Sequence, residues 1–170
     1  MSTSNPNAST SPKSRRDFLK FSGSIAAASA LAGVAANRCY AAENSTIKLA
    51  LVGCGGRGTG AVADAFSTKG GPVKLYAMAD LFENRLKSSL SNLMTSYKDK
   101  IDVPPERQFV GFDGYKKAID CLGSGDVVLL TTHAAFRPLQ FEYAVKKGVN
   151  VFAEKSFATD APEVDRKSVV

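Results

Sequence analysis

The sequence contains no tryptophan, one histidine and only three cysteines among its 170 residues. His133, Cys39, Cys54 and Cys121 do not have the spacing of metal ligands, so no metal site is expected. The chain also has no run of basic residues interleaved with aromatic ones, and we therefore expect no nucleic-acid interface. The remaining candidates for functional residues are glycines, carboxylates and lysines.

Long hydrophobic runs are absent as well. The apolar stretch from Phe21 to Ala36 spans 16 residues, is rich in alanine and is interrupted by Gly23 and Gly33. About 20 predominantly apolar residues are needed to cross a bilayer, so we expect no stable membrane span.

The segment before this stretch indicates export instead. Residues 1–13 are polar and are expected to be disordered. Ser14 to Lys20 contains two adjacent arginines and matches the bacterial twin-arginine signal, and Cys39-Tyr40-Ala41 forms a small-residue cleavage box. We expect a twin-arginine signal over 1–42, bound by the twin-arginine translocase through 14–20, a domain over 43–170 and a periplasmic location.

The net charge of +6 lies mostly in this signal. Residues 1–42 hold five basic residues and one acidic residue, whereas the rest of the chain is nearly balanced. A balanced charge is ordinary for a soluble domain and indicates no strongly acidic partner.

The most informative motif is the glycine loop Gly53-Cys54-Gly55-Gly56-Arg57-Gly58, which follows the apolar run 47–52. Such a loop closes a strand, opens a helix and holds the pyrophosphate of a dinucleotide at the helix N-terminus. Its first glycine allows the turn, the second admits the phosphates and the third lets helix and strand pack closely. The alternative is a structural turn. A Cys54–Cys121 disulfide would obstruct the loop, so both thiols are expected to be free.

The residues after the loop complete a strand–helix–strand unit. Apolar positions over 60–66 indicate a helix, the segment 69–72 ends it, and the apolar run 73–79 leads to Asp80. Asp80 lies 22 residues after Gly58, where a carboxylate accepts hydrogen bonds from a ribose hydroxyl; a surface aspartate is the alternative. A carboxylate repels the 2′-phosphate of NADP, so Asp80 favours NAD, whereas Arg57 can pair with a phosphate of either cofactor.

Periodicity extends the pattern to the end of the chain. It predicts helices over 82–97, 115–122, 138–147 and 161–170, and strands over 108–110, 126–130 and 149–153. Alternating strands and helices form a doubly wound parallel sheet, here a Rossmann-type α/β fold of about five strands. Ligands bind at the carboxyl ends of such strands, where the glycine loop, Asp80, Thr131 to His133 and Glu154-Lys155 are expected.

Several motifs together resemble the Gfo/Idh/MocA family of oxidoreductases: residues 50–58, Ala79-Asp80, Phe136-Arg137-Pro138 and Val151-Phe152-Ala153-Glu154-Lys155. The resemblance covers roughly residues 47–165. It implies NAD or NADP as the cofactor and hydride transfer to or from a sugar or cyclitol hydroxyl.

The resemblance also implies roles for single residues. Gly53, Gly55 and Gly58, with Gly56 and Arg57 beside them, would hold the pyrophosphate, and Asp80 would bind the adenosine ribose. Thr131, Thr132 and His133 would lie along the nicotinamide half, and Glu154 would orient the nicotinamide or its ribose. Lys155 would contact the reacting hydroxyl, where a cation stabilises the negative charge that develops as hydride leaves. A solvated lysine and an exposed histidine are the alternatives for Lys155 and His133.

The sequence departs from the family at two places. Ser156 replaces a proline of the family, which removes a backbone constraint beside Lys155. The family's further strand and C-terminal α/β domain, with its sugar site and oligomer interface, are not found among these residues. We therefore expect binding at most from this chain. A non-catalytic NAD(H)-binding module and a truncated, inactive gene product are the alternatives, whereas a methyltransferase leaves Glu154 and Lys155 unexplained.

Overall fold

The structure, a computed structural model, describes residues 46–166. The expected export signal, its cleavage box and the last four residues of the expected C-terminal helix lie outside this range. The described chain alternates strands and helices: β1 (Ile47–Val52), α2 (Gly56–Phe66), β2 (Val73–Asp80), α3 (Glu83–Tyr97), β3 (Gln108–Val110), α4 (Gly114–Asp120), β4 (Val127–Leu130), α5 (Arg137–Lys146), β5 (Asn150–Ala153) and α6 (Ala161–Arg166). Short 3-10 helices η1 (Lys98–Lys100), η2 (Pro105–Arg107) and η3 (Ala134–Phe136) lie in the connections.

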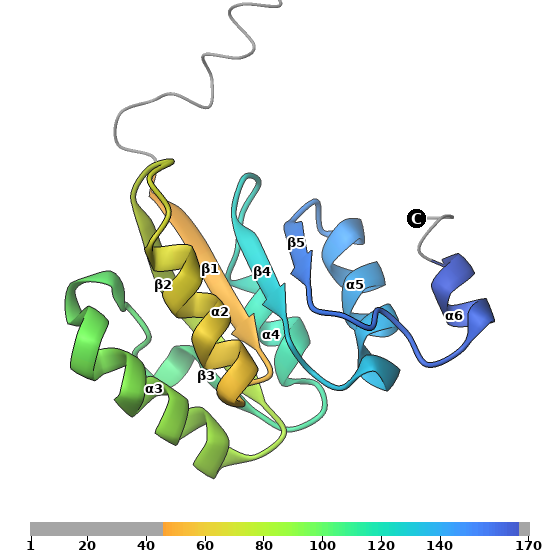
Figure 1. The fold of residues 1–170 in the computed structure, drawn as a ribbon, viewed down its shortest axis with the longest axis horizontal. Coiled ribbons are helices and arrows are strands. Elements are labelled where there is room, and N and C mark those ends of the chain that lie inside the picture. The colour runs from red at the N-terminus through yellow and green to blue at the C-terminus, as the bar shows by residue number, and fades with distance from the viewer. Residues whose placement is uncertain (1–45, 167–170) are drawn as a thin grey trace, which may run out of the picture. The chain divides into compact units, whose positions relative to one another are not determined.

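The five strands form one parallel sheet in the order β3-β2-β1-β4-β5 (Figure 1). This arrangement confirms the predicted Rossmann-type α/β fold. The chain adds strands on one side of β1 up to β3 and then continues on the other side with β4. Such a reversal leaves a crevice at the carboxyl ends of the strands, where doubly wound sheets bind their ligands.

The register brings the predicted site segments to one level of the sheet. Val52 pairs with both Ala79 and Leu130, and Leu130 pairs with Ala153. These residues form a row across four strands. The residues that follow them, which include the glycine loop, Asp80, Thr131 and Glu154, therefore leave the sheet side by side.

The apolar residues of β1 alternate between two cores. Leu49 and Leu51 pack with residues of α2 and α3, whereas Ala50 and Val52 pack with residues of α4 and α5. Successive side chains of a strand point to opposite faces, so a continuous apolar run is required where helices cover both faces. Ala50, Ala77 and Ala79 contribute small side chains to the second core.

Some element boundaries differ from the predicted ones for local reasons. The first helix begins at Gly56, inside the glycine loop that was predicted to open it, and Gly55 O accepts the N–H of Thr59 at 2.9 Å. Asp126 lies outside β4, since its carboxylate accepts the backbone N–H groups of Lys48 and Gly123. None of the helices between residues 46 and 166 has both the length and the apolar character needed to cross a bilayer.

Candidate functional site

The glycine loop forms a tight connection between β1 and α2. Gly53 has a φ of 99° and its N–H donates to Ala79 O at 2.8 Å. A Cβ on Gly58 would lie 2.1 Å from Gly53 O, so only glycine allows α2 to pack this closely on the loop. Gly55 and Gly56 instead face open space, with no other group within 4 Å of a Cβ built there. The first N–H groups of a helix have no intrahelical partner, and an anion fits this open N-terminus.

Asp80, the last residue of β2, is bonded directly to this loop. Its Oδ2 accepts the backbone N–H of Cys54 at 2.6 Å, and its Oδ1 accepts that of Phe82 at 2.9 Å. The side chain is half-buried, and each carboxylate oxygen can accept a second hydrogen bond. Asp80 therefore fixes the loop and still offers acceptor capacity to a hydroxyl group.

An apolar cavity of about 390 Å³ lies beside Asp80 on the side of α4 and α5. Val52 and Ala79 line it from the sheet, and Leu81 lines it just after β2. The aromatic rings of Phe112 and Phe136, with centroids 6.3 Å apart, line it from the connections before α4 and α5. Phe112 is 71% exposed and Phe136 is 45% exposed. Exposed aromatic rings beside an apolar cavity and a carboxylate suit a flat ring that carries a sugar.

Sequence reasoning did not identify these aromatic residues as site residues. Phe136 belongs to the motif Phe136-Arg137-Pro138, which contributed to the family resemblance, but no function was assigned to its residues. Phe112 precedes α4 and lies outside every motif, so only the fold brings it to Asp80.

The three residues after β4 have different environments. Thr131 donates its Oγ1 hydrogen bond to Gly53 O at 2.7 Å, so this side chain supports the glycine loop. Thr132 Oγ1 donates to Gln140 Oε1 at 2.6 Å and lines the apolar cavity. His133 is exposed, and its Nδ1 accepts the N–H of Ala135 at 3.3 Å at the start of η3.

Arg57 and Glu154 form an ion pair that joins α2 to the segment after β5. The side-chain hydrogen bond from Arg57, assisted by the backbone N–H of Lys155 at 3.0 Å, lowers the pKa of Glu154. The sequence suggested Arg57 for a phosphate and Glu154 for the nicotinamide half. The structure places these two side chains in direct contact.

Lys155 is exposed at the end of the β5 segment, and the peptide bond to Ser156 is cis. Within residues 46–166, the side chains of Lys155 and His133 form no hydrogen bond to the other predicted site residues. The structure thus brings the glycine loop together with Asp80, Thr131 and Glu154, and leaves Lys155 and His133 at its margin.

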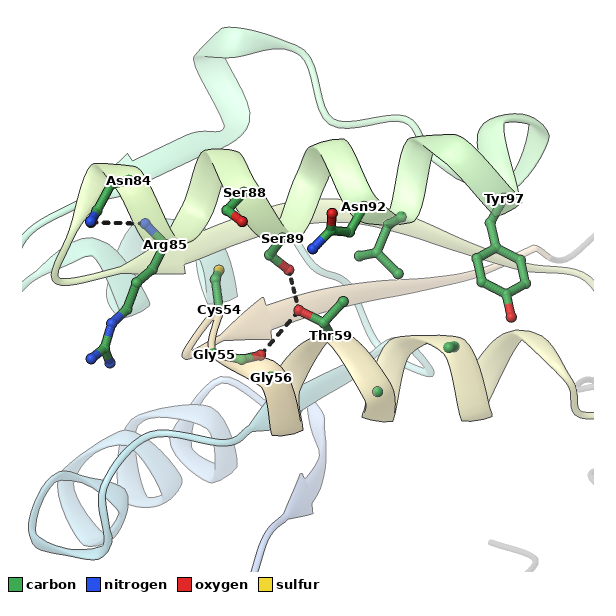
Figure 2. A pocket seen from close by; sticks show the side chains of 13 residues that line it. Cys54, Gly55, Gly56, Thr59, Asn84, Arg85, Ser88, Ser89, Asn92 and Tyr97 are labelled. Carbon is green, nitrogen blue, oxygen red and sulfur yellow. Dashed lines mark hydrogen bonds between the residues drawn. The ribbon is translucent and has the colours of Figure 1, made fainter.

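A larger groove of about 830 Å³ runs between α2 and α3 (Figure 2). Cys54, Gly55 and Gly56 line it at the glycine loop, and Thr59 meets Ser89 across it with an Oγ–Oγ distance of 2.7 Å. Asp80 and Thr132 line the smaller apolar cavity and not this groove. The loop therefore borders two recesses of different polarity.

Both described cysteines, Cys54 and Cys121, are free, as predicted. Cys54 is 3% exposed, its thiol donates to Ala79 O at 3.5 Å, and burial raises its pKa, so it remains a neutral thiol inside the loop. Between residues 46 and 166, no group of three histidine, cysteine or acidic side chains is arranged to hold a metal ion.

Comparison with known proteins identifies the signal sequence and solved structures that share the fold. Residues 14–32 match the family model of the twin-arginine translocation pathway signal sequence. None of the curated proteins matches the chain. Among solved structures, the chain is similar to myo-inositol 2-dehydrogenase from Lactobacillus plantarum, with 26% identity and a TM-score of 0.54 over 74% of this chain and 32% of that one.

Two further solved structures share the fold. Scyllo-inositol dehydrogenase from Lactobacillus casei, solved with NAD(H) and scyllo-inositol, has 24% identity and a TM-score of 0.55 over 74% of this chain and 33% of that one. The 3-ketoreductase KijD10 from Actinomadura kijaniata, solved with NADP, has 18% identity and a TM-score of 0.54 over 74% of this chain and 35% of that one. The chain spans about a third of the length of these structures. All three share the fold, and the 26% identical myo-inositol 2-dehydrogenase agrees with the resemblance to Gfo/Idh/MocA-type oxidoreductases that the sequence motifs indicate.

Proposed function

We propose that the described domain binds a nicotinamide dinucleotide, with NAD preferred over NADP, as the cofactor-binding part of an exported oxidoreductase. The observation that carries this proposal is the meeting of an open helix N-terminus, the Asp80 carboxylate and an apolar cavity at one edge of the sheet. The solved neighbours that hold NAD(H) or NADP support the cofactor class.

Each part of the cofactor has a chemically matched place. The pyrophosphate would lie over Gly55 and Gly56, where open space meets the positive end of α2. Asp80 would accept hydrogen bonds from the adenosine ribose, and the apolar cavity beside Phe112 would hold the adenine ring. The nicotinamide half would extend toward Glu154.

The reaction class that we propose is hydride transfer to or from a sugar or cyclitol hydroxyl. When bound, the nicotinamide ring supplies the hydride acceptor or donor. Lys155 would contact the substrate hydroxyl and stabilise the negative charge that develops on its oxygen. Glu154, held by Arg57, would orient the nicotinamide end. The twin-arginine signal supports export of the protein, and we propose the periplasm as its destination.

Titration of the chain with NADH and NADPH, followed by nucleotide fluorescence, tests this proposal. We expect tighter binding of NADH than of NADPH. Asp80→Ala should narrow this preference by roughly tenfold, because removal of one charge repulsion and a ribose hydrogen bond corresponds to about 1.4 kcal/mol. Asp120→Ala is a suitable control, since Asp120 is an exposed acid at the end of α4 that pairs with Lys147 and lines neither recess beside the glycine loop.

The absence of binding by either nucleotide would contradict the proposed cofactor. An unchanged ratio of the two dissociation constants in Asp80→Ala would show that Asp80 does not set the preference between NADH and NADPH. A separate assay of polyol oxidation distinguishes an oxidoreductase from a module that only binds NAD(H).

A further inference from the structure

We propose that Arg137 is a positioning residue that holds the backbone on both sides of Lys155 and thereby sets the nicotinamide end of the site. This inference rests on the proposed function. Arg137 is the first residue of α5 and is only 5% exposed. Its Nε donates to Thr132 O at 2.8 Å, and one terminal guanidinium nitrogen donates to both Glu154 O and Ser156 O.

These bonds continue the connection between β4 and β5 beyond the point where the sheet ends. The last backbone hydrogen bond between the two strands runs from Glu154 N to Leu130 O at 3.0 Å. After that bond, Arg137 joins the segment after β4 to the segment after β5 through three carbonyl groups. Two of these carbonyls, those of Glu154 and Ser156, flank Lys155 in the chain. Arg137 therefore determines the direction in which Lys155 leaves the sheet.

The chemistry of the side chain explains why an arginine suits this position. A guanidinium is planar and carries N–H donors in a fixed fork, so it can bind carbonyls of two segments in one defined geometry. A lysine ammonium has no such fork. Within residues 46–166, Arg137 forms no ion pair with a carboxylate, and burial lowers its pKa while the charge of Glu154 raises it. A buried cation that is held by backbone carbonyls fixes their orientation at the expense of its own solvation.

The test compares a whole dinucleotide with the half that does not reach this segment. Affinities for NADH and for ADP, which lacks the nicotinamide and its ribose, are measured on the full chain and on Arg137→Lys, which keeps the charge and loses the fork. We expect the affinity for NADH to fall by about tenfold, as for the loss of one charged hydrogen bond, and the affinity for ADP to stay unchanged. A merely structural role would weaken both ligands in parallel.

Arg107→Lys is the matched control. Arg107 also donates to backbone carbonyls, those of Tyr76 and Asp102, but lies before β3, away from the carboxyl ends of the strands. Arg107→Lys should lower the melting temperature and leave the ratio of the two ligand affinities unchanged. If Arg137→Lys does not fold, Arg137→Gln, which keeps a planar N–H donor, provides the same comparison.

The outcomes separate the two proposals. A wild-type chain that binds neither NADH nor ADP contradicts the proposed function. Suppose that the wild-type chain binds both ligands. If the Arg137 variants then keep both affinities, or lower both by the same factor, the positioning role alone is overturned. Loss of cooperative folding in both Arg137 variants also overturns it, because Arg137 would then be a structural residue.

Discussion

Gly58 and Gly55 belong to one loop but are constrained by different neighbours. A Cβ on Gly58 would lie 2.1 Å from Gly53 O and 2.6 Å from Thr131 Oγ1, and neither the loop carbonyl nor the hydroxyl that bonds to it can move away without breaking the turn. A Cβ on Gly55 would meet no group of the protein. The fold therefore requires glycine at position 58, whereas only a bound phosphate would require it at position 55.

Gly58→Ala should destabilise the domain by about 1–3 kcal/mol or more, because overpacking at a fixed backbone forces a shift of the loop. The matched control is Gly60→Ala in the same helix, where a Cβ meets nothing and alanine is expected to stabilise the helix by about 0.5–1 kcal/mol. Urea denaturation followed by circular dichroism measures both. Equal stability of the two variants would contradict the packing role of Gly58.

At the scale of elements, the carboxyl edge of the sheet is tied together by side chains that bridge segments far apart in sequence. Asp80 ties β2 to the glycine loop, and Thr131 ties β4 to it. Arg57 and Glu154, 97 residues apart, tie α2 to the segment after β5. These ties hold the connections that would surround the cofactor, because the helices themselves pack on the faces of the sheet and not on its edge.

The tie between Arg57 and Glu154 predicts a pH dependence. The pKa of Glu154 is lowered in the folded state by the hydrogen bond from Arg57 and the N–H of Lys155. A lowered pKa means that the contribution to stability is complete above the ordinary glutamate pKa and is lost as pH falls through the lowered value. The melting temperature of Glu154→Gln should therefore fall less than that of the wild type as the pH is lowered from about 5 to about 3.

Melting curves across this pH range provide the measurement. Arg57→Gln should flatten the acid dependence in the same way, and the double variant should add nothing further, since both changes remove one interaction. Additive effects of the two substitutions would show that the ion pair does not contribute as a unit.

At the scale of the whole molecule, the described domain leaves part of its sheet uncovered. β5 is the last strand of the described sheet, and Phe152 within it is 44% exposed. Beside it, a cavity of about 390 Å³ is lined by apolar residues of β1, β4 and α2. The matched part of the chain covers only 32–33% of these solved neighbours, so this surface is where a comparison with them is most informative.

The twin-arginine signal leads to a prediction for the intact protein. Replacement of both Arg15 and Arg16 by lysine should retain the protein in the cytoplasm, because the translocase reads the arginine pair. Arg38→Lys, outside residues 14–32, keeps the pair and should be exported normally. Cell fractionation followed by immunoblotting measures the distribution. Equal periplasmic recovery of the double variant and the control would contradict this route of export.

The sequence by itself determined the elements and indicated where the candidate site lies. Buried parallel strands need continuous apolar runs and helices need apolar positions at a spacing near 3.6, so both leave local patterns, as in 126–130 and 82–97. The glycine loop and Asp80 were found because their constraints act over a few residues or over a fixed strand–helix–strand distance. The exact ends of elements were less predictable, since Asp126 bonds to Lys48 instead of continuing β4.

Only the tertiary structure decided which side chains meet. It paired Arg57 with Glu154, brought Phe112 to the cavity beside Asp80 and placed the buried Arg137 across the ends of β4 and β5. These contacts join residues that lie 5 to 97 positions apart along the chain, with no periodic spacing. Packing and desolvation select such partners only when the strands are in register. For that reason local patterns could indicate the candidate site but could not assign its contacts.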